Sequence, residues 1–339
     1  MHDIRERLRG DSAPRITVLP DGSVDRRSAV VDAEGEMLSR ETVGAEIAED
    51  GKTFLTKWQG VEPGGQSVNA ARQVDALGAE TTLLGHLDHS IFDSLPFHTY
   101  SMGDPAEVHV YELADGVVMF AAETTDIETW TFDRVRNAVG PETSSVFAVD
   151  AVLWTNWAAF PYGTEAIPEL ASLLPDDSTL VIDPGAVSTR PLDERLAFLD
   201  MLAETAFPGE VVLSPNRREA DLLVDGVEDP TREQIATELL EAAAIEAVVV
   251  HDRPAATVAT SETILHVPTV EDVEPTRHAG AGDRFSGGVA YGRAAGWSWE
   301  ETLTLGNACA THYLLHGRSG DSEDLHVLLT ERGPLSGES

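Results

Sequence analysis

The sequence predicts an α/β protein with one doubly wound sheet, helices on both faces of that sheet, and a small β lid. Three observations support this fold class. After about residue 150, short apolar runs alternate with segments of helical spacing, which is typical of a parallel sheet that is covered on both sides. Before that point, apolar and polar residues alternate between turn signals, which indicates hairpins. No repeat and no Pro/Gly-rich linker divides the chain, so we expect residues 1–339 to form a single domain.

The first apolar run, Arg15 to Leu19, is short and β-branched and stops at a Pro-Asp-Gly turn, so we expect a strand there. Residues 28–59 alternate without helical spacing, which predicts a small twisted sheet of hairpins. A second hairpin is expected where residues 108–111 and 117–120 flank Ala-Asp-Gly. The lid would be formed by residues of about 26–62 and 105–122.

The later elements follow from the alternation of apolar runs and helical spacing. Continuous apolar runs predict strands, and segments with apolar residues three and four apart predict helices. We expect strands over 151–154, 180–182, 211–213 and 247–250, and helices over 164–174, 193–203 and 235–244.

The charge balance is extreme: 59 Asp and Glu residues face 23 Lys and Arg residues, which gives a net charge of −36. Only Lys52 and Lys57 are lysines. Such a chain repels itself in dilute buffer, whereas molar salt shortens the Debye length to about 3 Å and removes most of the repulsion. The composition therefore indicates a salt-rich cytoplasm of the kind that extreme halophiles maintain. An ordinary acidic protein is the alternative.

The same composition argues against several classes of protein. Nucleic-acid binding relies on clustered Lys and Arg, which this chain lacks. A single cysteine, Cys309, excludes an intrachain disulfide and any multi-cysteine metal site. The first residues contain no apolar segment of the signal-peptide type, and no later run has the length of a membrane-spanning helix, so we expect a cytoplasmic protein without a membrane partner. The eleven histidines are scattered and form no H-x-x-x-H pair with a carboxylate, which disfavours a metal hydrolase.

The stretch G-A-G-D-R-F-S-G-G over 280–288 carries the strongest chemical signal. Glycines that open a helix leave backbone N–H groups free and aim the helix dipole at the same point, which forms an anion site. Asp283 would lie at that helix entrance. It is either a helix N-cap or a general base beside a bound phosphoryl group. The chain has no G-x-x-x-x-G-K-[ST] motif, so this is not a Walker-type loop.

A second glycine turn, Gly64-Gly65, opens a helix whose residues 68, 71 and 77 face inward. Asn69 is polar among small apolar neighbours near the first turn of this helix. It suits either a ligand hydroxyl or the backbone groups of the helix start.

Together these stretches resemble the paired signatures of the ribokinase/PfkB carbohydrate kinases, namely GG-x-x-x-N-x-A and GAGD. The Asn216-Arg217-Arg218-Glu219 run is similar to the family's N-x-x-E, and Gly22-Ser23-Val24-Asp25 follows the first strand, where the family carries a substrate-binding aspartate. The resemblance extends from about residue 15 to 317. It implies a ribokinase-like three-layer fold, and it implies a nucleotide-dependent kinase that phosphorylates a hydroxyl of a small sugar or sugar phosphate.

The resemblance also implies roles for single residues. Asp283 would be the catalytic base, and Gly280, Ala281 and Gly282 would form the anion hole. The acceptor would be bound by Asp25, Gly64, Gly65, Asn69 and Arg72. Asn216 and Glu219 would hold Mg²⁺ through water, with ATP as donor and ADP or GTP as alternatives. Asn307 would border the nucleotide, as would His251, which begins the stretch that replaces the family's T-x-G-x-x-G segment. Lid hairpins often form the dimer interface in this family, so we expect a homodimer.

The acceptor is predicted from the arginines near the inferred site. Arg72 lies where relatives acting on phosphorylated sugars often carry arginine, Arg26 and Arg27 follow Asp25, and Arg277-His278 replace the usual D-T. Arginine binds phosphate in a bidentate fork. These residues favour a sugar phosphate, with ribose 1-phosphate, converted to the 1,5-bisphosphate, as the first candidate. They could instead pair with acidic side chains. A nucleoside, a neutral sugar (ribose, fructose or ketodeoxygluconate) and a non-catalytic sugar or nucleotide sensor remain alternatives.

Overall fold

The computed structural model describes residues 2–8, 13–224, 230–270, 275–277 and 279–332. Its main sheet has nine strands in the order β13-β12-β11-β10-β9-β8-β1-β4-β5. Strands β5 to β11 of this order run parallel, and β12 and β13 continue the sheet as antiparallel strands. The strands are β1 Arg15–Leu19, β4 Glu80–Gly85, β5 His98–Ser101, β8 Ala151–Thr155, β9 Thr179–Asp183, β10 Glu210–Leu213, β11 Ala247–His251, β12 Ala255–Thr260 and β13 Ile264–Pro268.

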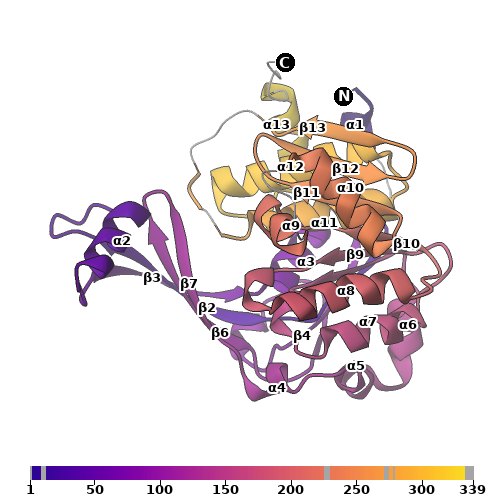
Figure 1. The fold of residues 1–339 in the computed structure, drawn as a ribbon, viewed down its shortest axis with the longest axis horizontal. Helices are drawn as coiled ribbons and strands as arrows, with labels where there is room; N and C mark the ends of the chain where they lie inside the picture. The colour runs from indigo at the N-terminus through magenta and orange to yellow at the C-terminus, as the bar shows by residue number, and fades with distance from the viewer. Residues whose placement is uncertain (1, 9–12, 225–229, 271–274, 278, 333–339) are drawn as a thin grey trace.

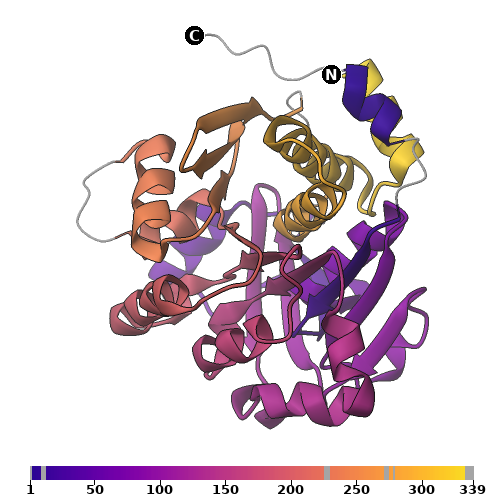
Figure 2. The ribbon, with the colours of Figure 1, turned by 90° about the vertical axis from the view of Figure 1, so that its right-hand side faces the viewer.

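Helices cover both faces of this sheet (Figures 1 and 2). The face that carries the two glycine turns is covered by α1 His2–Arg7, α3 Gln66–Ala76, α11 Ala281–Ala294, α12 Trp299–His316 and α13 Ser322–Glu331. The other face is covered by α4 Thr125–Glu128, α5 Phe132–Val139, α6 Thr143–Phe147, α7 Gly163–Ala171, α8 Leu192–Glu204, α9 Arg217–Leu223 and α10 Arg232–Ala243.

The strands supply both hydrophobic cores because successive side chains point to opposite faces. In β8, Val152 and Trp154 pack on the α7 and α8 side, whereas Ala151 and Leu153 pack on the α3 and α11 side. The three-layer ribokinase-like α/β fold expected from the sequence is therefore confirmed. The expected strands β1, β8, β9, β10 and β11 and helices α7, α8 and α10 are present, with ends displaced by up to three residues.

A second sheet, which we call the lid sheet, has four strands in the order β3-β2-β6-β7. Figure 1 shows its far end projecting away from the main body. Its strands are β2 Ser23–Val31, β3 Leu55–Gly64, β6 Ala106–Leu113 and β7 Gly116–Ala122. These strands fall in the segments where the sequence predicts a lid. Closure of this sheet over a ligand stays a prediction.

The prediction of hairpins alone over residues 28–59 was wrong, because the helix α2 Arg40–Ala48 connects β2 to β3. Ser39 caps this helix by accepting a hydrogen bond from the backbone N–H of Thr42. No residue of α2 is buried. A helix with no apolar face gives no periodic signal in the sequence, which explains why the pattern did not reveal it.

Candidate active site

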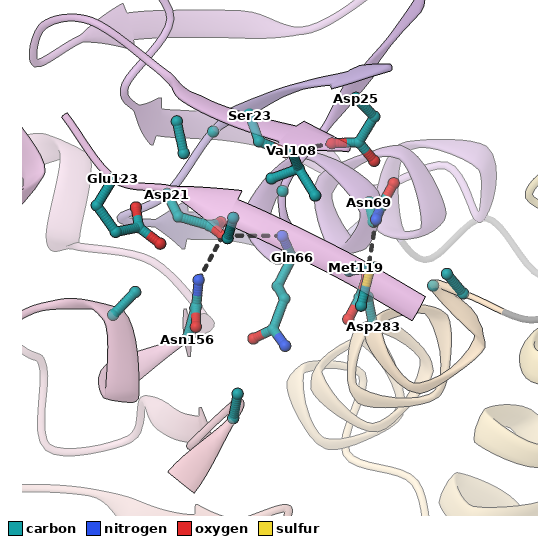
Figure 3. Close-up of a pocket in the computed structure, with 18 of the residues that line it drawn as sticks. Asp21, Ser23, Asp25, Gln66, Asn69, Val108, Met119, Glu123, Asn156 and Asp283 are labelled. Carbon is teal, nitrogen blue, oxygen red and sulfur yellow. Dashed lines mark hydrogen bonds between the residues drawn. The ribbon is translucent and has the colours of Figure 1, made fainter. Parts of the chain in front are cut away.

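A cavity of about 730 Å³ lies between the lid sheet, the carboxyl ends of β1 and β8, and the amino-terminal ends of α3 and α11. Figure 3 shows side chains from these elements pointing toward one another. Six of the residues that the sequence assigned to the site line this cavity: Asp25, Gly65, Asn69, Arg72, Gly280 and Asp283.

The amino-terminal end of α11 has the free backbone groups that an anion site needs. Gly280 is the N-cap residue, with φ of 93°, and it offers no side chain to the helix. The first N–H groups, those of Ala281, Gly282 and Asp283, are therefore not capped by it. Gly280 is the N-cap and Asp283 is the third residue of the helix. Of the two roles that the sequence allowed for Asp283, the N-cap role is therefore excluded. The anion-hole role of these groups stays a prediction.

Asp283 is buried and accepts a 2.7 Å hydrogen bond from the side-chain amide of Asn69. Burial raises the pKa of its carboxyl to about 7, and the nearby negative charges of Asp183 and Asp21 act in the same direction. The positive charge of Arg284 and the hydrogen bond from Asn69 oppose this shift. A carboxyl with a pKa near 7 can accept a proton from a reacting hydroxyl and release it at neutral pH.

Asp21, at the end of β1, was missed by the sequence analysis. Its carboxylate accepts hydrogen bonds from the backbone N–H groups of Gln66 (3.0 Å) and Ser67 (2.6 Å) and from the side-chain amide of Asn156 (3.0 Å). Gly65, the N-cap residue of α3, has no side chain. The carboxylate of Asp21, which follows β1, therefore caps this helix instead. The available signal was its position directly after an apolar strand and before Gly22, at the edge where parallel strands present ligands.

Asp25 lies on β2 and accepts a 2.6 Å hydrogen bond from the hydroxyl of Ser23. Burial raises the pKa of its carboxyl. The backbone of Gly64 approaches this carboxylate so closely that a Cβ on Gly64 would lie 2.2 Å from Asp25 Oδ1. Gly64 does not line the cavity itself, but its lack of a side chain is what lets Asp25 occupy this position.

Three of the arginines that suggested a phosphorylated acceptor pair with glutamates. Arg26 contacts Glu107 at 3.1 Å, Arg27 forms a buried ion pair with Glu112, and Arg277 binds Glu62 through two hydrogen bonds of 2.7 and 2.8 Å. Arg72 lines the cavity, and within the described part of the chain its one hydrogen bond is to the carbonyl of Pro63, at 3.4 Å. His278 lies outside the described residues.

The residues assigned to the nucleotide and the metal lie outside this cavity. Asn216 and Glu219 form a capping box at the start of α9, and each side chain accepts a 3.0 Å hydrogen bond from the other's backbone N–H. The amide of Asn307 donates to the carbonyls of Val267 and Pro268, both at 3.1 Å.

His251 stacks on Phe285 with ring centroids 4.5 Å apart, and a Cβ on Gly282 would lie 3.4 Å from its ring. Burial lowers the pKa of His251 to about 4, so its imidazole is neutral at pH 7. His251 therefore borders the amino-terminal end of α11 as an uncharged ring.

Buried carboxylates surround that end of α11. Glu219 has its pKa raised by burial and by the charges of Asp183 and Asp283. Asp183 accepts a 2.8 Å hydrogen bond from Ser286, and burial raises its pKa to about 6. Across the described ranges, no three His, Cys, Asp or Glu side chains are close enough to bind one metal ion directly.

Comparison with known proteins agrees with this geometry. The family model described as prokaryotic ketohexokinase matches residues 35–332. A ketohexokinase of Haloferax volcanii is 27% identical over 349 residues, which cover 96% of this chain and 86% of that protein. The ribokinase structure from Thermotoga maritima (TM-score 0.66, 18% identity) covers 94% of this chain and 100% of that one. Arabidopsis thaliana ribokinase, complexed with ribose and ATP, has a TM-score of 0.66 at 19% identity over 94% of this chain and 99% of that one.

The fold, the paired glycine turns and the family match define a carbohydrate kinase of the ribokinase/PfkB type. The matched region leaves out residues 1–34, which include α1, β1 and β2, and residues 333–339. Within that class, the chain belongs to the prokaryotic ketohexokinase family.

Proposed function

We propose that this protein is an ATP-dependent ketohexokinase that transfers the γ-phosphoryl group to a hydroxyl of a neutral ketohexose such as fructose. The observation that supports this acceptor most directly is the charge of the cavity. Six carboxylates and four arginines line it. The carboxylates are Asp21, Asp25, Glu62, Glu123, Glu128 and Asp283, and the arginines are Arg27, Arg72, Arg190 and Arg284.

Excess carboxylates suit a neutral polyol because ionised carboxylates accept hydrogen bonds from hydroxyl groups. The same charges disfavour an acceptor that already carries a phosphate. The charges of two lining arginines are neutralised within the protein, since Arg27 forms an ion pair with Glu112 and Arg190 forms one with Glu194. We therefore propose a neutral ketohexose in place of ribose 1-phosphate, the acceptor expected from the sequence. The name of the Haloferax volcanii relative supports a ketohexose as well.

Asp283 takes the proton of the attacking hydroxyl, the hydroxyl oxygen forms a bond to the γ-phosphorus, and the bond to the β-phosphate oxygen breaks to release ADP. The free N–H groups of Ala281, Gly282 and Asp283 would stabilise the charge on the transferred group. Asp21, Asp25 and Asn69 would bind the hydroxyls of the acceptor.

Magnesium is expected to assist by neutralising phosphate charge when it is bound with the nucleotide. Glu219 and Asn216 would hold it through water, because one carboxylate oxygen and the amide oxygen are already used in the capping box. The raised pKa values of Asp183 and Glu219 fit this assignment, since a divalent cation relieves repulsion between neighbouring carboxylates. ATP is proposed as donor because the Arabidopsis thaliana ribokinase binds it.

A homodimer formed through the lid sheets is proposed from side-chain alternation in that sheet. One face lines the cavity with Asp25, Val108 and Met119, and the opposite face exposes Trp58 and Phe120. We also propose a cytoplasm of high salt, on the basis of the net charge of −36. No described helix combines the length and apolar character needed to cross a membrane.

The test is a turnover assay in molar KCl with ATP and Mg²⁺, using fructose, ribose, ribose 1-phosphate and adenosine as acceptors. The proposal expects the highest kcat/KM with fructose and stoichiometric release of ADP and a fructose phosphate. Higher kcat/KM with ribose 1-phosphate or with adenosine would contradict it.

A further inference from the structure

Two guanidinium groups in the cavity form no ion pair with any carboxylate of the described residues. The cavity is lined by Arg27, Arg72, Arg190 and Arg284, and two of these form ion pairs with glutamates. Arg72 and Arg284 do not: among the described residues, no carboxylate lies within ion-pairing distance of either. In a chain with 59 acidic residues, the lack of a partner at these two positions requires an explanation.

Arg284 is buried, with 4% of its surface exposed, and directly follows Asp283 in α11. One terminal nitrogen donates a 2.8 Å hydrogen bond to the carbonyl of Gly280, and the guanidinium lies 3.9 Å from the ring centroid of Tyr313. Its Nε is buried without a hydrogen-bond partner. The side chain therefore keeps unused donors beside the N-cap residue of α11.

Gly280 fixes where this guanidinium lies relative to the rest of the site. A Cβ on Gly280 would lie 2.5 Å from Arg284 Nη1 and 3.4 Å from both Asn69 Nδ2 and Tyr313 Oη. The same Asn69 amide donates to Asp283. The guanidinium of Arg284 thus lies next to the two groups that would contact the reacting hydroxyl and its proton.

Arg72 approaches from α3, one turn beyond Asn69. Among the residues that the structure describes, its one hydrogen bond is the 3.4 Å contact with Pro63, and its positive charge repels that of Arg284. The nearest glutamate, Glu62, is held by Arg277 in a bidentate pair. The charge of Glu62 therefore attracts Arg72, but no ion pair forms between them, because both carboxylate oxygens of Glu62 accept from Arg277.

The charges of Asp283 and Glu62 attract these guanidinium groups, but neither group has a carboxylate at ion-pairing distance among the described residues. A buried guanidinium with unused donors is costly, and phosphate esters are anions that arginine forks fit well. We propose that Arg72 and Arg284 form a phosphate subsite that binds the phosphoryl group after its transfer to the acceptor hydroxyl. The ligand is a phosphate monoester carried by the sugar at the reacting carbon. A neutral acceptor does not use this subsite, so the two arginines favour the product side of the reaction.

This inference depends on the proposed function only for the identity of the sugar. A phosphate monoester at this position could also come from an acceptor that is already phosphorylated. The six carboxylates that line the cavity favour transfer to a neutral acceptor as the source, because they repel an acceptor that already carries a phosphate. The two sources predict different ligands, which allows a direct test.

The experiment is a calorimetric titration in molar KCl of fructose 1-phosphate, fructose 6-phosphate and fructose into the wild type, Arg284→Met and Arg72→Met. The turnover assay on fructose identifies which isomer is the product. Loss of a charged hydrogen bond to phosphate should weaken binding of the product isomer about 10- to 100-fold in each variant. Binding of fructose should change by less than about threefold. Arg293→Met is the matched control, since Arg293 lies on the same helix but pairs with Glu210 at 2.9 Å.

The outcomes separate the two proposals. If the variants bind the product isomer as tightly as the wild type, or lose fructose and product affinity equally, the subsite is refuted while the ketohexokinase assignment stands. If the other isomer is the one whose binding depends on Arg284, the phosphate belongs to the acceptor and the inference is overturned. If the wild type does not phosphorylate fructose, titration with inorganic phosphate still decides: binding that requires Arg284 supports the subsite, and binding that ignores Arg284 refutes it.

Discussion

The side-chain amide of Asn69 donates a 2.7 Å hydrogen bond to Asp283 across 214 residues of sequence. The contact joins the amino-terminal turns of α3 and α11, the two helices that the glycine turns introduce. An amide donor holds the carboxylate in one orientation and favours its ionised form. The two motifs that signalled the family in the sequence are therefore one structural unit, with the proposed base at its centre.

Asp283→Asn should lower kcat about 10²- to 10⁴-fold, because asparagine preserves the shape of the side chain but cannot accept the proton. Nucleotide affinity should change little, since Asp283 is proposed to act on the acceptor hydroxyl. Steady-state kinetics and nucleotide titration measure both quantities. Asp75→Asn on α3 is the control, because Asp75 is partly buried but does not line the cavity. Near-normal turnover of Asp283→Asn would reduce Asp283 to a structural role.

The raised pKa of Asp283 predicts how stability depends on pH. Its folded pKa of about 7 lies above the ordinary value of 3.8, so the folded protein holds a proton that the unfolded chain releases between these values. Its contribution to the free energy of unfolding is thus present below pH 4 and is lost as the pH rises to 7. Asp283→Asn should therefore raise the Tm at pH 8 relative to the wild type. An equal or lower Tm would show that the carboxylate is not strained by its burial.

The sequence predicted five of the nine strands of the main sheet, namely β1, β8, β9, β10 and β11, because these are short, continuous apolar runs. It gave no prediction for β4, β5, β12 and β13. It predicted that glycine turns open two helices, because such turns are local signals, and the turns at Gly65 and Gly280 both border the cavity. It missed Asp21, whose role as a cap for α3 depends on a contact across 45 residues. It left open whether the arginines bind phosphate or pair with acidic side chains, because pairing of Arg277 with Glu62 joins segments 215 residues apart and has no local signature.

Glu219→Gln tests whether the N-x-x-E run binds metal or only caps α9. Glutamine supports a capping box in this same protein, since Thr231 and Gln234 form one at the start of α10. Stability should therefore be nearly unchanged, while the Mg²⁺ concentration for half-maximal activity should rise because a hard cation loses an anionic oxygen nearby. Activity measured against free Mg²⁺, with the Tm as control, separates the two roles. If the dependence of activity on free Mg²⁺ is unchanged in this variant, the only role of Glu219 is to cap α9.

Salt should stabilise this protein strongly. At low ionic strength the −36 net charge destabilises the compact state through self-repulsion, and at molar salt that repulsion is screened within about 3 Å. The Tm measured by calorimetry should rise steeply as KCl increases toward molar concentrations. A Tm that stays flat over this range would contradict the assignment to a high-salt cytoplasm.

The outer face of the lid sheet predicts the oligomeric state. In the lid sheet, Arg26 on β2 lies opposite Val61 on β3 and opposite His109 on β6, and His109 in turn lies opposite Phe120 on β7. Ser28 on β2 lies opposite Trp58 on β3. Because Arg26 and Ser28 lie two residues apart on β2, these apolar side chains share one face. Trp58 and Phe120 are 59% and 62% exposed there. Large exposed aromatic side chains on one face are characteristic of protein interfaces.

Trp58→Glu combined with Phe120→Glu should therefore convert a dimer to a monomer, since each subunit would place two further carboxylates in the same apolar contact. Ile47→Glu is the matched control, because Ile47 is 59% exposed but lies on α2, away from the strands of the lid sheet. Light scattering in molar KCl gives the mass of each variant directly. A wild-type mass of one chain, or a dimer that survives the double substitution but not Ile47→Glu, would assign the apolar face another role. The substituted side chains point away from the cavity, so kcat/KM should fall only if dimer formation itself holds the lid sheet in place.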